Sequence, residues 1–275
     1  MKRILFPTDF SEVATNAFVH ALEFAKKVNG ELILLHTFEF PIVDNQYFPE
    51  NYKMLFDSLE LSKFDTFKDE ITKLRSIAKE RNLEDIKMSH RLMDGDLVNN
   101  MKIAIKEDDI DFIVMGTSGA NGWAAIFIGT NTGEVLTSIE VPLLAVPSTS
   151  KFNAIETIGF TTRYRNKDKE TLRQVLKIAK KLSANVKCLY VKNNDSDVSE
   201  ITINAWEKEF NDENLQFFVI PSEEVEQTIF DFIDNQNIDI LAMTTYKRNF
   251  FVELFTTHFT ERVSYKSSIP ILIMH

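Results

Sequence analysis

The sequence of 275 residues contains a single cysteine, Cys188, and no run of 18 consecutive apolar residues. One cysteine excludes an internal disulfide, which agrees with a reducing compartment. The missing apolar run argues against a membrane span. Residues 1–7 lack the sustained apolar region of a signal peptide and are expected to form a strand. Together these absences predict a cytoplasmic protein.

A surplus of basic charge is also missing, because the formal net charge at pH 7 is -10. Broad nucleic-acid binding requires a basic surface, so this charge argues against a nucleic-acid partner. A phosphate-bearing ligand would need local backbone donors. Hydrophobic residues make up 44% of the chain and charged residues 26%, a composition typical of globular proteins.

The two halves of the sequence resemble each other. A shift of 154 positions places Phe6 and Thr8 on Phe160 and Thr162, with further matches along the following helix. A shift of 128 positions matches the end of the first half to the end of the second. The two shifts differ by 26, so the second half is shorter in its middle. We interpret this pattern as two domains, residues 1–148 and 151–275.

Each half alternates short apolar runs with amphipathic segments. Such alternation predicts right-handed parallel crossovers and an α/β fold of two tandem doubly wound, Rossmann-like, five-stranded parallel-sheet domains. Gly30 is expected to end the first helix. The last strands of the two halves are expected to pair, and homodimerisation is a further expectation. Strands are predicted at 3–7, 32–38, 86–93, 112–116, 142–147, 156–161, 186–191, 215–220, 239–243 and 271–274, and first-half helices at 12–28, 53–81, 96–106 and 132–139.

The first half carries a candidate anion-binding loop after its fourth strand. Its glycines are spaced Gly116-x2-Gly119-x9-Gly129, followed by Thr130 and Thr132. Glycine allows close approach of the backbone to phosphate, and amides at a helix start bind anions. No lysine follows the glycines, so the loop is not a P-loop of the usual NTPase kind.

Asp9 follows the first strand, and ligands of doubly wound sheets bind beyond the carboxyl ends of strands at the switch point in strand order. Its carboxylate is suited to ribose hydroxyls, but it is also a good N-cap for the helix at 12–28. Both roles remain open. No histidine or serine has the neighbours of a metal ligand or catalytic nucleophile, so neither metal-binding nor catalytic residues are predicted.

The sequence resembles the universal stress protein family in three motifs. These are Phe6-Pro7-Thr8-Asp9-Phe10-Ser11, Leu34-Leu35-His36-Thr37 and the loop Gly116-x2-Gly119-x9-Gly129-Thr130. The resemblance covers most of the chain as two copies. It implies bound ATP, AMP or ADP, with Mg²⁺ on the phosphates and slow or no hydrolysis. It further implies that Asp9 holds the ribose, that Pro7, Thr8, Thr37 and Met115 line the adenine and ribose pocket, and that Gly116, Gly119, Gly129, Thr130, Asn131 and Thr132 hold the ribose and phosphates.

The second half departs from this pattern at every glycine. Asp9 corresponds to Arg163, and Gly116, Gly119, Gly129 and Thr130 correspond to Thr244, Lys247, Thr257 and His258. Side chains then occupy the space that phosphates would need. We therefore expect nucleotide binding in the first half only.

Residues 38–67 are rich in aromatic side chains, which indicate either core packing or a lid or partner surface. The leading hypothesis is a nucleotide-binding stress or regulatory protein. The alternatives are a slow ATPase or adenylate-handling enzyme, and an interaction protein with an empty pocket.

Overall fold

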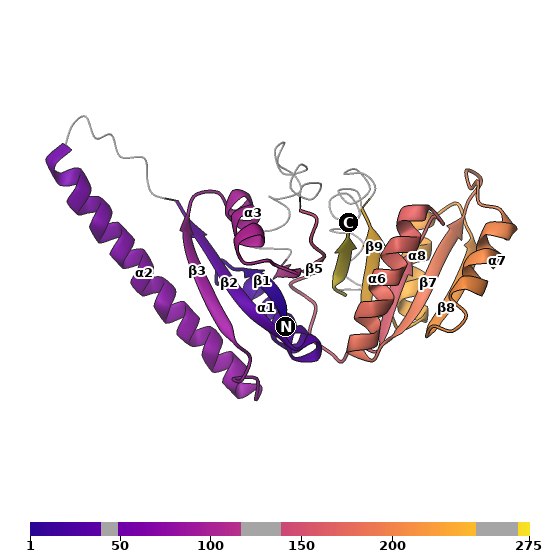
Figure 1. Cartoon of the computed structure of the whole chain (residues 1–275), viewed down its shortest axis with the longest axis horizontal. Helices are drawn as coiled ribbons and strands as arrows, with labels where there is room; N and C mark the ends of the chain where they lie inside the picture. The colour runs from indigo at the N-terminus through magenta and orange to yellow at the C-terminus, as the bar shows by residue number, and fades with distance from the viewer. Residues whose placement is uncertain (40–48, 117–138, 246–268) are drawn as a thin grey trace. The chain divides into compact units, whose positions relative to one another are not determined.

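The computed structural model describes residues 1–39, 49–116, 139–245 and 269–275, with the backbone alone at 49–57. The chain divides into two compact units, Met1–Met115 and Gly116–His275, called here the first and second unit (Figure 1). Each unit alternates strands and helices along the chain, as the periodicity of the sequence predicts.

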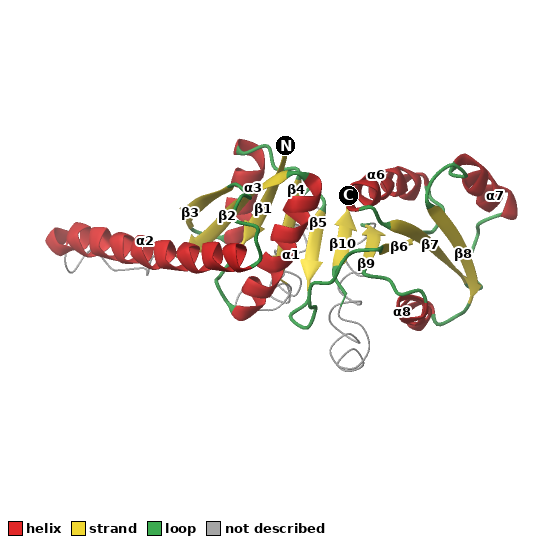
Figure 2. Ribbon diagram, turned by 90° about the horizontal axis from the view of Figure 1, so that it is seen from below, coloured by secondary structure: helices red, strands yellow, loops and turns green. Residues whose placement is uncertain are grey.

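The first unit is built on four parallel strands in the order β3-β2-β1-β4. Helices α1 and α2 cover one face of this sheet and α3 covers the other (Figure 2). The order reverses between β1 and β4, which creates a switch point at the carboxyl ends of these strands. The elements are β1 (Lys2–Pro7), α1 (Glu12–Val28), β2 (Gly30–Phe38), α2 (Pro49–Glu80), β3 (Met88–Asp94), α3 (Leu97–Glu107) and β4 (Phe112–Gly116).

The second unit has the strand order β5-β10-β9-β6-β7-β8. Strands β6 to β10 are parallel, and β5 pairs antiparallel with β10, so the expected pairing of the two last strands is confirmed. The predicted domain boundary at residues 148–151 stays a prediction. The two compact units divide after Met115, so β5, which pairs with β10, belongs to the second unit. The elements are β5 (Leu143–Val146), β6 (Thr157–Thr161), α6 (Asn166–Leu182), β7 (Asn185–Lys192), α7 (Glu200–Glu209), β8 (Leu215–Pro221), α8 (Val225–Asn235), β9 (Ile240–Thr244) and β10 (Ile271–Met274).

The end of α1 corrects one expectation from the sequence. Asn29, with φ 53°, is the left-handed C-cap, and its amide donates to the carbonyl of Ala25. Gly30 is instead the first residue of β2, where a Cβ atom would lie 3.0 Å from the carbonyl oxygen of Lys2. Close approach of β1 therefore favours glycine at this position. The helix predicted at 132–139 lies outside the described residues, except for its last residue.

The two units share fine geometry at positions 154 residues apart. The amide of Phe10 donates to Thr8 Oγ1 at 3.0 Å, and the amide of Tyr164 donates to Thr162 Oγ1 at 2.8 Å. Phe10 and Tyr164 both have positive φ, 61° and 57°. Positive φ is uncommon for bulky side chains, so its recurrence at matched positions supports the repeat seen in the sequence.

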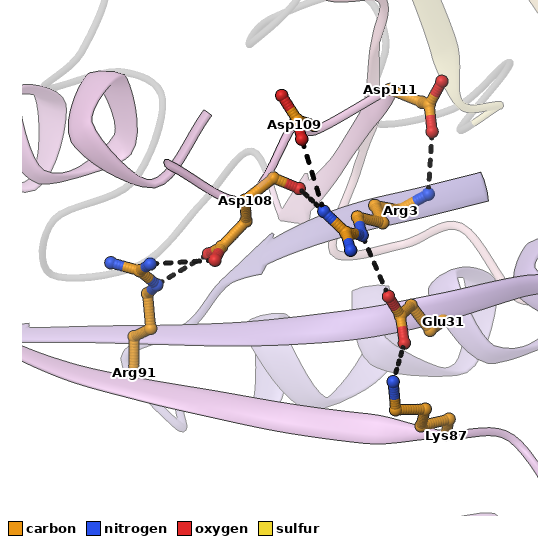
Figure 3. Close-up of polar contacts among 7 residues, drawn as sticks. All are labelled: Arg3, Glu31, Lys87, Arg91, Asp108, Asp109 and Asp111. Carbon is orange, nitrogen blue, oxygen red and sulfur yellow. Dashed lines mark hydrogen bonds and ion pairs between the residues drawn. The ribbon is translucent and has the colours of Figure 1, made fainter. Parts of the chain in front are cut away.

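An ion-pair network holds the amino ends of the first unit's strands (Figure 3). The buried carboxylate of Glu31 contacts Arg3 Nε at 3.1 Å and Lys87 Nζ at 2.6 Å. Arg3 also donates from Nη1 to the carbonyl of Asp108 at 2.8 Å, and its amide donates to Asp111 Oδ2 at 2.9 Å. These contacts join β1, β2 and the start of β4. They lie at the amino ends of the strands. The ligand is expected at the other edge of the sheet, beyond the carboxyl ends of the strands.

Replacing Glu31 with glutamine is expected to lower the free energy of unfolding at pH 7 by about 1–2 kcal/mol. The Lys87 ammonium, aided by Arg3 and opposed by burial, holds the pKa of Glu31 below its ordinary value of 4.5. A lowered folded-state pKa stabilises the protein above the unfolded pKa, and this contribution is lost as pH falls through the folded pKa. Urea denaturation of both proteins across pH 3–7 measures this effect.

The difference between wild type and Glu31→Gln should therefore shrink as the pH drops below about 4.5. Glu107→Gln is the control, because the Glu107 side chain is 57% exposed in its pair with Arg91 and such pairs contribute little. A difference between wild type and Glu31→Gln that stays constant over this pH range would contradict the account.

Candidate functional site

The carboxyl edge of the first unit brings together six of the predicted site residues. Pro7 lies opposite Leu35 in β2, and Leu5 lies opposite Ile113 in β4. Thr8 and Asp9 follow β1 directly, and Thr37 and Met115 lie at the carboxyl ends of β2 and β4. The edge formed by β2, β1 and β4 thus carries Pro7, Thr8, Asp9, Thr37, Met115 and Gly116.

The remaining predicted site residues follow β4 in the sequence. Gly119, Gly129, Thr130, Asn131 and Thr132 lie outside the described residues, so the phosphate-binding role of their loop stays a prediction. The structure does show where that loop begins. Gly116 is the last residue of β4 and is half-buried at the same edge as Asp9.

The start of α1 corrects the second role considered for Asp9. Ser11 is the N-cap, because its side chain accepts a hydrogen bond from the amide of Ala14. Asp9 precedes the cap, and its Oδ1 accepts the amide of Ser11 at 3.0 Å. No described residue donates to Asp9 Oδ2, and the side chain is only half-buried. One carboxylate oxygen therefore fixes the loop while the other can accept a ligand hydroxyl.

His36 anchors the loop that carries Asp9. Its Nδ1 lies 2.8 Å from the carbonyl oxygen of Thr8. A carbonyl only accepts, so this nitrogen is protonated and donates. The ring centroid lies 4.8 Å from that of Phe10, and Phe67 stacks on the imidazole at 6.1 Å. The sequence names His36 within the motif Leu34-Leu35-His36-Thr37, and the structure adds its contact with the loop.

The Thr8 hydroxyl donates to none of the residues that the structure describes. The side chain is 7% exposed, and Oγ1 accepts the amide of Phe10. No acceptor for its hydroxyl proton lies among the described residues. A buried hydroxyl with an unused proton favours a ligand that accepts it.

The second unit satisfies the equivalent hydroxyl internally. Thr162 donates from Oγ1 to Asp168 Oδ2 at 3.1 Å. The same carboxylate oxygen accepts the amides of Arg163 and Arg165 at 2.8 and 3.3 Å. Asp168 is 1% exposed, and its counterpart under the 154 shift is Ala14. Sequence reasoning missed Asp168, although this single exchange between the two copies is the signal that identifies it.

The second unit also differs from the first in carrying a buried side chain at the end of its fourth parallel strand, β9. Thr244, which replaces Gly116, is 8% exposed, and no described group forms a hydrogen bond with its Oγ1. Arg163, which replaces Asp9, is exposed. Lys247 and His258 lie outside the described residues. At these two positions the second unit therefore carries a threonine and an arginine where the first unit has a glycine and a carboxylate.

Neither a membrane-spanning helix nor a metal-binding cluster occurs among the described residues. None of the helices there is long and apolar enough to cross a membrane. No group of three His, Cys, Asp or Glu side chains in those ranges is placed to hold a metal ion. Cys188 is buried, and burial raises the pKa of its thiol well above the ordinary value, so the thiol stays protonated.

Known proteins resemble this chain both in sequence and in fold. Residues 1–147 match the model of the universal stress protein family. Universal stress protein MJ0577 of Methanocaldococcus jannaschii is 30% identical over 160 residues, covering 53% of this chain and 94% of its own. Universal stress protein MJ0531 of the same organism is 23% identical over 150 residues, covering 54% and 84%. The crystal structure of a universal stress protein from Archaeoglobus fulgidus has a TM-score of 0.70 at 15% identity, covering 99% of this chain and 97% of its own. This last likeness concerns the fold, and it extends over the second half.

Proposed function

Since the chain belongs to the universal stress protein family, we propose that it is a stress-response or regulatory protein whose first half binds an adenine nucleotide. Residues 1–148 and 151–275 form two copies of one domain in this proposal, and only the first copy holds ATP, ADP or AMP. The proposal is a binding function, with no residue assigned to catalysis.

The observation that carries the proposal is the pair of unused polar groups at the switch point. Asp9 Oδ2 is an acceptor without a described donor, and the Thr8 hydroxyl is a donor without a described acceptor. A ribose offers hydroxyls that both donate and accept, so it fits this pair. Pro7 and Met115 supply the apolar surface that an adenine ring needs.

Backbone amides of the loop after Gly116 would hold the phosphates, as the glycine spacing predicts. Asp9 is the one carboxylate among the six described site residues. Mg²⁺ needs about six oxygen ligands and usually keeps several waters. The phosphates and water would therefore supply most of its coordination.

The second half is proposed to bind no nucleotide. The Asp168 carboxylate already takes the Thr162 hydroxyl and lies at the start of α6, where a helix otherwise favours an anion. A phosphate brought to this position would meet a like charge. The loop between β6 and α6 is therefore complete without a ligand.

Replacing Asp9 with asparagine is expected to raise the dissociation constant for ATP at least tenfold. Asparagine keeps an oxygen for the Ser11 amide, so the loop is retained, but its amide group replaces the acceptor at Oδ2. Fluorescence titration with a labelled adenine nucleotide, displaced by ATP, measures the constant.

Arg163→Asn is the matched control, because Arg163 occupies the same position in the second copy. This variant should bind ATP like wild type. Equal weakening by both substitutions, or weakening by Arg163→Asn alone, would move the site away from the first half.

A further inference from the structure

Helix α2 is much longer than the strands it connects. Its 32 residues span about 48 Å at 1.5 Å per residue. The nine residues of β2 span about 30 Å. The corresponding helix of the second unit, α7, has ten residues and spans about 15 Å. Figure 1 shows α2 extending past the ends of β2 and β3, so part of this helix has no sheet to cover.

The buried face of α2 stops near its middle. Phe67, Ile71, Leu74 and Ala78 are each at most 5% exposed and pack onto the first unit. One turn earlier, on the extension of this stripe, the exposure rises to 52% at Phe64 and 62% at Leu61. These two side chains are three residues apart and lie on one face of the helix. Large exposed apolar side chains grouped on one face indicate an interface.

The charged residues around Phe64 have a symmetric arrangement of opposite sign. Glu60 lies four residues before Phe64 and Lys68 lies four residues after it, so all three share one helical face. Closer to the centre, Lys63 precedes Phe64 and Asp65 follows it. All four charged residues are exposed, and none has an ion pair with any described residue.

We propose that α2 pairs with α2 of a second copy of this chain, antiparallel about a two-fold axis at Phe64. In such a pair, a residue n positions before Phe64 lies opposite the residue n positions after it on the partner. Glu60 then lies opposite the partner's Lys68, and Lys68 lies opposite the partner's Glu60. Lys63 and Asp65 are matched in the same way at the edges of the contact.

The same charges exclude the other simple arrangement. A parallel pair in register places Glu60 against the partner's Glu60 and Lys68 against the partner's Lys68, so like charges meet at both ends. The antiparallel pair brings the two Phe64 rings together, and Leu61 lies one residue from the position opposite the partner's Lys68, whose aliphatic stem covers it. Pairing thus covers the two exposed apolar side chains and neutralises the four flanking charges.

Charge reversal tests the pairing by sedimentation equilibrium of the full chain. Glu60→Lys and Lys68→Glu should each raise the dimer dissociation constant at least tenfold, because each creates two like-charge contacts. The double variant Glu60→Lys with Lys68→Glu should restore the wild-type constant. Asp69→Lys is the control, since residue 69 is turned about 140° away from Phe64 on the same helix.

A monomeric wild-type chain at about 100 μM would overturn the proposal, as would single reversals that leave the dimer intact. A double variant that stays as weak as the single ones would overturn the antiparallel register.

Crosslinking gives a second measurement that does not depend on charge. Phe64→Cys should form a covalent dimer on mild oxidation, and Thr66→Cys, on the opposite face, should not. Equal crosslinking of the two variants would overturn the proposal. Cys188 is buried and does not interfere.

Discussion

Replacing Asp168 with alanine is expected to lower the free energy of unfolding of the second unit by about 2–4 kcal/mol. The substitution leaves three donors without their acceptor: the Thr162 hydroxyl and the amides of Arg163 and Arg165. Thr162 is itself buried, so water does not readily replace the carboxylate there. Guanidinium denaturation followed by circular dichroism at 222 nm measures the change.

Glu170→Ala is the matched control, because Glu170 lies on the same helix and is exposed. It should change the stability by less than about 0.5 kcal/mol. Asp168→Asn keeps one acceptor oxygen and should fall between the other two variants. If Asp168→Ala were as stable as Glu170→Ala, the carboxylate would not hold the loop at the start of α6.

Replacing Gly129 with lysine is expected to weaken ATP binding at least a hundredfold. The glycine spacing predicts that the backbone at this position approaches the phosphates closely, and a side chain there would fill that space. The new positive charge attracts phosphate, so a loss of affinity would have to come from steric exclusion. Isothermal titration calorimetry with ATP measures the affinity.

Thr257→Lys supplies the control, because residue 257 matches residue 129 in the second copy. It adds the same side chain to the half that is proposed to bind no nucleotide, so the ATP affinity should not change. Unaltered affinity in Gly129→Lys would place the phosphates elsewhere.

Much of the fold was predictable because local patterns decide it. The apolar run at residues 112–116 gave β4 with both bounds correct, and the periodicity of residues 12–28 gave α1. The alternation of these elements was sufficient to predict a parallel sheet with its switch point. The α/β fold is confirmed, and six of the predicted site residues lie at one edge of that sheet.

The contacts that the sequence did not reveal join positions far apart in the chain. The bond from His36 to the carbonyl of Thr8 depends on the register of β1 and β2, which composition does not encode. The ion pair of Glu31 with Arg3 needs the same register, and its ion pair with Lys87 needs the register of β2 and β3. The exact cap of α1 was also missed, since Asp9 and Ser11 are both good capping residues and only the geometry distinguishes them.

The number of adenine nucleotides bound per chain tests the central claim most directly. Calorimetric titration of the wild-type protein with ATP should saturate at one nucleotide per chain, and Asp9→Asn should weaken this single event. A stoichiometry of two would show that the second half binds as well. The absence of any binding by ATP, ADP or AMP would contradict the proposed function outright.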